Sequence, residues 1–149
     1  MSTIKSQIMA AIETELKKIT SVKMVKRQEI FPVDLDNAPR PALYFYDDNE
    51  IKTQNPPGIA FVEMPLFVTG VLQMTPAGLT SANSPADDLH GQVEEKIFGL
   101  VNPASGLIWK IGQHRMKKQY ASDAVCLVEM EFQVYYGHAW GLPSVQANV

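Results

Sequence analysis

The last long apolar segment, residues 124–136, constrains the fold more than any other part of the sequence. Its even-numbered positions are all apolar, from Ala124 to Tyr136, whereas its odd-numbered positions change from apolar to polar at Glu129. A period of two places successive side chains on opposite faces of a β-strand. The pattern therefore predicts a strand in a sheet that buries one face and leaves the other in water.

Two segments have the period of an amphipathic helix. In residues 3–19 and 84–101, apolar side chains recur every three or four positions. Ser2 or Thr3 is a suitable N-cap for the first helix, and Ser84 followed by Pro85 is a favourable start for the second. Each helix has one apolar stripe, which must be buried against another element, most simply a sheet.

Further strand patterns alternate with turn-rich connectors. They occupy residues 22–31, 42–46, 59–74 and 107–120. The basic residues of the first favour a sheet edge, and Pro65 inside the third predicts a bulge, a bend or a local edge. The last two strands are expected to form a hairpin that brings basic residues 113–118 next to acidic residues 129–131. We expect polar loops at residues 47–58 and 75–85.

These segments predict one α+β domain over residues 1–140, in the order α-β-β-β-α-β-β. We expect a mostly antiparallel or mixed sheet of 4–5 strands with two main helices packed on one face. The chain has 149 residues, which suits a single domain and allows a sizeable core. The single cysteine, Cys126, cannot form an internal disulfide. Residues 141–149 are expected to be a flexible C-terminal tail.

Charge and hydropathy exclude several classes of protein. Lys plus Arg number 13 and Asp plus Glu number 16, a net charge of −3, which argues against a general nucleic-acid binder. There is no run of about 18 apolar residues, and the N-terminus lacks the apolar region of a signal peptide. We therefore expect no membrane association and a protein that stays in the cytoplasm where it is made.

Motifs for catalysis are absent from the sequence. There is no P-loop, no dinucleotide-binding fingerprint and no nucleophile elbow. His90 and Glu94 are one helical turn apart and offer two metal ligands, but no motif spacing supports a site, so a solvated helix face is favoured. Cys126 belongs to the apolar face of its strand and is expected to be an inert buried thiol.

Three carboxylates could either take part in acid–base catalysis or belong to a sheet face exposed to water. Glu129 and Glu131 project from one face of the last strand, and Glu63 projects from another strand. Nothing in the pattern indicates the burial that would tune their pKa values, so the wet sheet face is favoured. We accordingly expect no enzyme, with no catalytic residue, no cofactor and no metal.

The order and length of the elements resemble the tail terminator, or tail completion, proteins of long-tailed bacteriophages and prophages. The resemblance covers most of residues 3–140. It rests on a leading helix (IKSQIMAAIETELKKI), a proline-rich connector (FPVDLDNAPRPALYFY), a central strand (IAFVEMPLFVTGVLQ), a second helix (DDLHGQVEEKIFGLV) and a final strand (CLVEMEFQVYYGHAW). Other phage neck and minor tail proteins share this layout.

The resemblance implies a structural virion protein of the tail or neck, made in the cytoplasm of a host bacterium. Such proteins form a homo-oligomeric ring, usually a hexamer, that caps the tail tube, ends its polymerisation and joins the head connector. The implied partners are further copies of the chain, the tail tube protein and the head–tail connector or stopper protein. DNA passes through without specific binding, and Glu63, Glu129 and Glu131 are expected to face that channel, where carboxylates would not hold phosphates.

A closed ring joins two different patches of neighbouring subunits. We expect basic residues of one subunit to meet acidic residues of the next, with two aromatic side chains adding contacts. These interface residues are Lys23, Lys26, Arg27, Asp47, Asp48, Glu50, Tyr135 and Trp140. The alternative is a small ligand-binding or enzymatic α+β domain without a recognisable motif, which would show a deep pocket with perturbed titratable groups.

Overall fold

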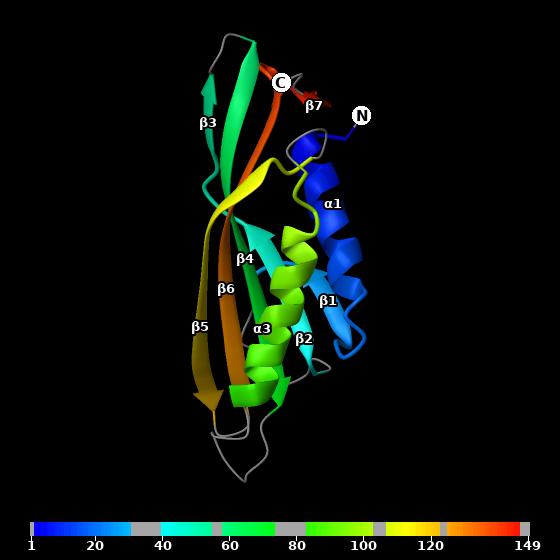
Figure 1. Ribbon diagram of the computed structural model, residues 1–149, viewed down its shortest axis with the longest axis vertical. Coiled ribbons are helices and arrows are strands. Elements are labelled where there is room, and N and C mark those ends of the chain that lie inside the picture. The colour runs from blue at the N-terminus through cyan, green and yellow to red at the C-terminus, as the bar shows by residue number, and fades with distance from the viewer. Residues whose placement is uncertain are drawn as a thin grey trace.

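The computed structural model describes residues 2–30, 40–54, 58–73, 83–102, 107–122 and 125–146. Within them the chain forms the predicted α+β fold, with two helices and a mixed sheet of seven strands (Figure 1). The elements are α1 (Ile4–Lys17), β1 (Met24–Arg27), β2 (Ala42–Asp47), β3 (Ile51–Gln54), β4 (Ile59–Gln73), α3 (Asn83–Phe98), β5 (Lys110–Ser122), β6 (Val125–Ala139) and β7 (Leu142–Gln146).

The sheet is organised around the two long strands β4 and β6. The strand order is β1-β2-β4-β6-β5, with β3 also paired to β4 and β7 also paired to β6. β1 and β2 are parallel, and the other pairs are antiparallel. β4 and β6 pair along their whole length, from Ile59 opposite Ala139 to Gln73 opposite Val125. The predicted hairpin of the two strands that follow α3 is confirmed by the β5–β6 pairing.

Both helices cover the same face of the sheet, as predicted (Figure 1). Ile8, Ile12 and Leu16 of α1 are fully buried, and so are Val93 and Ile97 of α3. They pack against the even-numbered side chains of β6, which form the apolar face expected from the sequence. A smaller cluster on the opposite face consists of Ala42, Tyr44, Val71, Val125 and Leu127.

The N-terminal cap of α1 is one of the two that the sequence offers. The Ser6 backbone N–H donates to Thr3 Oγ1 at 3.0 Å, which satisfies one of the free donors of the first turn. The start of α3 differs slightly from the prediction, because the helix begins at Asn83 rather than after Ser84. The predicted loop over residues 75–85 otherwise lies outside the described residues.

Two short strands are additional to the prediction. Residues 47–58 were expected to form a polar loop, but residues 51–54 form β3, whose four residues are all exposed. In the expected tail, residues 142–146 form β7, with Leu142 opposite Ala139 and Gln146 opposite His138. Neither strand has a buried face. An alternating pattern appears in a sequence only where one face of a strand is buried, so the sequence does not predict these two strands.

Pro65 occupies a local edge inside β4. On one side of β4, β2 pairs as far as Leu66 and β3 pairs as far as Glu63, which leaves Pro65 between them. The Asp48 N–H donates to the Pro65 carbonyl at 3.3 Å, so the position of the missing proline N–H faces this gap. On the other side Pro65 lies opposite Gln133 without a register shift, so of the three predicted alternatives the local edge is correct.

The helix–sheet core gives a first testable expectation. Leu16→Ala removes a fully buried side chain of α1 and should lower the free energy of unfolding by about 2–5 kcal/mol. Leu142→Ala makes the same chemical change at a side chain that is 57% exposed, and should cost less than about 0.5 kcal/mol. Urea denaturation followed by circular dichroism measures both values. Equal losses would show that α1 does not pack on the sheet in solution.

Candidate functional site

One end of the sheet extends beyond α3. β3, β7 and the adjoining ends of β4 and β6 form this end (Figure 1). It holds a depression of about 700 Å³, walled by Ile51, Phe61, Trp109 and Tyr135 among others. The rings of Phe61 and Trp109 meet edge to face with centroids 5.0 Å apart. A Cβ at Gly137 would lie 2.2 Å from Trp109 Cη2, so a glycine is needed where the indole approaches β6.

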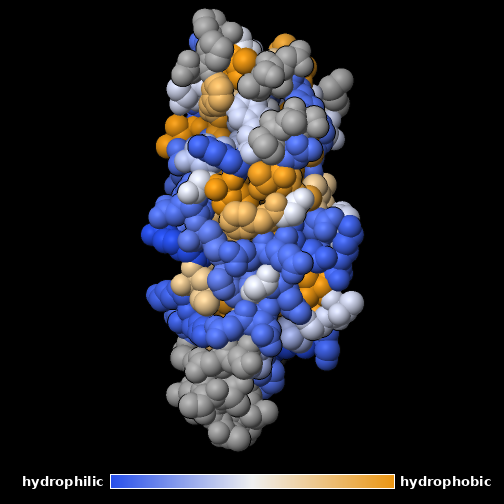
Figure 2. All heavy atoms as spheres, in the orientation of Figure 1, coloured by the Kyte–Doolittle hydropathy of each residue, from blue (hydrophilic) through white to orange (hydrophobic). Residues whose placement is uncertain are grey.

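Exposed apolar side chains occur both in this depression and elsewhere at this end of the sheet. Ile51 is 61% exposed, Leu142 57% and Trp140 46%. Figure 2 shows that the surface over the lower parts of α1 and α3 is mainly hydrophilic, whereas apolar side chains gather at and above the upper end of α3. We call the depression together with Ile51, Trp140 and Leu142 the apolar end. A concentrated apolar surface of this kind is typical of a binding interface.

The three carboxylates expected to share a wet face do so. Glu63, Glu129 and Glu131 lie on the face of the sheet opposite the helices. Glu131 Oε2 is 2.6 Å from Arg115 Nη2, Tyr135 donates to Glu63 Oε1 at 3.2 Å, and Glu129 lies opposite Lys117.

The predicted cross-strand charge pairing is thereby confirmed. This outer face is mixed in charge rather than acidic, because the basic residues of β5 lie directly beside the acids of β6.

The predicted charged interface residues divide into two groups. Asp47 is bound within the chain by Lys5 at 2.5 Å and by Arg27 at 3.5 Å, and Lys5 also lies 3.5 Å from Glu50. Lys23, Lys26 and Asp48 are exposed on the surface. Arg27 and Asp47 were expected to meet residues of a neighbouring copy, but they pair within the chain because β1 runs beside β2.

The Lys5–Asp47–Glu50 network continues into the core. The hydroxyl of the buried Tyr136 donates to Glu50 Oε2 at 3.0 Å. Burial first, and then the Glu50 carboxylate, raise the pKa of Tyr136 far above its ordinary value. Burial opposes the charge of Lys5, but the hydrogen bonds and charges of Asp47 and Glu50 outweigh it and raise the pKa of that ammonium group.

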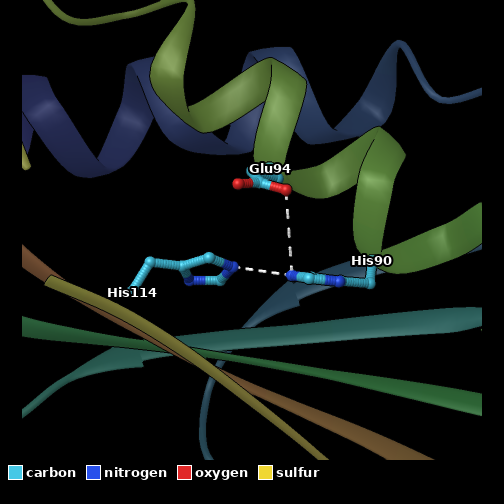
Figure 3. Close-up of side chains that lie close together, drawn as sticks. All are labelled: His90, Glu94 and His114. Carbon is cyan, nitrogen blue, oxygen red and sulfur yellow. Dashed lines mark hydrogen bonds and ion pairs between the residues drawn. The ribbon is translucent and has the colours of Figure 1, made fainter. Parts of the chain in front are cut away.

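A histidine pair joins α3 to β5 (Figure 3). His90 Nε2 lies 2.6 Å from His114 Nε2, and Glu94 Oε2 lies 3.9 Å from His90 Nε2. The His90 side chain is 21% exposed, so the expected solvated helix face is wrong at this position. Burial first, and then the charge of His114, lower the pKa of His90. The sequence missed the pair because the two histidines lie in different elements with no motif between them.

The buried residues Cys126 and His138 have simpler surroundings. Cys126 is fully buried, as expected, and burial raises the pKa of its thiol, which disfavours the reactive thiolate. His138 is 4% exposed, and its Nδ1 is 2.8 Å from the Ala139 carbonyl, away from the other histidines. Neither described helix is long and apolar enough to cross a membrane.

Comparisons with known proteins include a distant likeness in structure. No family model matches the sequence, and no curated protein matches it either. Among solved structures, a chain of the virion of a native gene transfer agent particle is similar over 91% of this chain and 92% of that chain. The two share 12% sequence identity with a TM-score of 0.41, which is too distant to support an argument about function.

The buried Tyr136–Glu50 contact predicts a loss of stability in alkali. Above about pH 10 the unfolded chain ionises Tyr136, whereas the native state keeps its proton because the pKa is raised. The free energy of unfolding should therefore fall as pH rises. Tyr136→Phe should reduce the slope by up to about 1.4 kcal/mol per pH unit.

Chemical denaturation between pH 7 and pH 12 measures both slopes. Below about pH 9 the native and variant curves should run parallel, because Tyr136 is neutral in both states there. Parallel curves above pH 10 as well would contradict the assigned role of Tyr136.

Proposed function

We propose that this chain is a non-enzymatic structural subunit of a phage-type virion. Copies of it assemble into a closed ring, a hexamer by its resemblance to tail terminators, which caps the tail tube and ends its growth. The ring then forms the joining surface to the head connector. The observation that carries the proposal is the apolar end, where Ile51, Trp140 and Leu142 are exposed at the same end of the sheet as a depression of about 700 Å³.

The occupant proposed for the apolar end is a second copy of this chain. A closed ring uses a heterologous interface, so the apolar end of one subunit meets a different surface of its neighbour. Asp48 is exposed next to β3, and Lys23 and Lys26 are exposed on and beside β1. These charges give the two surfaces complementary rims around an apolar centre, which is the usual anatomy of a protein interface.

The outer sheet face is proposed to line the channel of the ring. Its basic residue Arg115 is held by Glu131, and Lys117 lies opposite Glu129. Cations that already have carboxylate partners bind phosphates weakly, because binding would require breaking the existing pairs. Such a surface lets DNA pass without being retained. The tail tube protein and the head–tail connector are the other partners in this proposal.

A ligand-binding domain is the second candidate function. The depression at the apolar end has a volume within the range of about 300–1,000 Å³ that is usual for small-molecule sites. Its walls are largely apolar, so the ligand would be an apolar small molecule. This function needs no self-association, which separates it from the first.

A pair of variants on β3 tests the ring proposal. Ile51 lines the depression, whereas Gln54 is exposed on the same strand without lining it. Ile51→Asp should raise the concentration for half-maximal assembly at least about tenfold, because a charge would be buried in the interface. Gln54→Asp adds the same charge and should leave assembly unchanged. Light scattering over a concentration series, with negative-stain images, measures the result.

Purified tail tubes complete the test. If the free chain is monomeric, it should still cap tube ends, and Ile51→Asp should abolish the capping. A chain that remains monomeric at every concentration and leaves tube ends uncapped would overturn the proposal and favour the ligand-binding function.

A further inference from the structure

Side chains from two separate elements bring metal-ligand atoms to one place beside the sheet. His90 and Glu94 project from α3, and His114 projects from β5 (Figure 3). One ligand atom from each lies within 4.8 Å of the other two. All three residues are partly buried, so the cluster is neither sealed in the core nor fully hydrated.

The orientation of His114 is fixed for metal binding. Its Nδ1 lies 3.2 Å from the backbone carbonyl of Glu131, which only accepts hydrogen bonds, so Nδ1 carries the proton. Nε2 is then the nitrogen with a free lone pair, and it faces His90. The ring is also stacked on Phe132 with centroids 4.1 Å apart. A metal-binding histidine typically donates its second N–H to a carbonyl in this way.

The distance between the two histidines indicates that a proton or a metal ion lies between them. The two Nε2 atoms are 2.6 Å apart, shorter than the usual range of about 2.7–3.2 Å for hydrogen bonds from N–H. Two nitrogen lone pairs at this distance repel each other unless a proton or a metal ion lies between them. Zinc bound at about 2.0–2.1 Å from each nitrogen would set them roughly 3.3 Å apart, an opening of less than 1 Å.

We propose that His90, Glu94 and His114 bind a divalent transition metal ion, with Zn²⁺ as the best fit. Two imidazoles and one carboxylate match the ligand preferences of zinc, whereas Mg²⁺ and Ca²⁺ prefer oxygen ligands. The Glu94 side chain is 45% exposed, which leaves the fourth position of a tetrahedral site to water.

The ion would fasten α3 to the edge of the sheet. β5 is an edge strand of the sheet. An ion pair already links it to α3, with Lys118 Nζ 2.6 Å from Asp87 Oδ1. A metal bond to His114 adds a second link about one helical turn farther along α3. This role concerns the stability of one subunit and is independent of ring assembly.

Metal titration of the whole chain tests the inference. After treatment with EDTA, Zn²⁺ at about 100 times its Kd should raise Tm by roughly 5–10 °C. Mg²⁺ at the same concentration should leave Tm unchanged. Co²⁺ should give the visible absorption bands of a tetrahedral site, which is a readout that does not depend on stability.

Matched variants locate the ligands. His90→Gln and His114→Gln should abolish the Co²⁺ bands, and Glu94→Gln should weaken Zn²⁺ binding at least about tenfold. Glu95→Gln changes the adjacent exposed carboxylate, and His138→Gln changes a histidine outside the cluster; both should keep the full response. Each comparison is between the same variant with and without metal, so a change in apo stability does not affect it.

Two results would overturn the inference. The first is a chain whose Tm and Co²⁺ spectrum do not respond to metal, which would leave the histidine pair as a hydrogen bond between imidazoles. The second is a metal response that persists in His114→Gln, which would place the binding residues elsewhere.

Discussion

The antiparallel pairing of β4 with β6 is the constraint on which the rest of the structure depends. Its register places Leu66 opposite Phe132 in the core and Phe67 opposite Glu131 on the outer face. β2 and β3 attach to the free side of β4, and β5 and β7 attach to the free side of β6. A slip of one residue would turn every side chain to the other face and bury Glu129 and Glu131 under the helices. The register of β4 and β6 therefore determines both which side chains form the core and which form the charged outer face.

The sequence predicted those elements whose side chains are divided between core and water. Ile8 and Ile12 identify α1, and the even positions of β6 identify one of the two longest strands, because burial imposes the period that the sequence displays. β3 and β7 could not be found in this way. Ile51 and Leu142 are apolar but exposed, so their strands carry no amphipathic pattern. They are specified by pairing with β4 and β6 alone.

The candidate sites show a different limit of prediction. Arg115 and Glu131 were predictable partners, since a hairpin brings neighbouring segments together. Arg27 and Asp47 were also recognised as complementary, but whether such a pair lies within a chain or between chains depends on the parallel β1–β2 pairing. His90 and His114 depend on still more of the fold, because a helix must lie over the correct stretch of a strand.

An irregularity near the start of β5 decides which of its side chains face α3. Ile111 lies opposite the core residue Val134, but the register shifts before Gln113, so the inward positions change from odd to even numbers. A Cβ at Gly112 would lie 2.5 Å from the Tyr135 ring, which explains the glycine at the shift. Without the shift, Arg115 would point under α3 and His114 would point into water. The same bulge thus places Arg115 beside Glu131 on the outer face and His114 beside His90 under α3. The charge pairing on the outer face and the histidine cluster therefore have one structural cause.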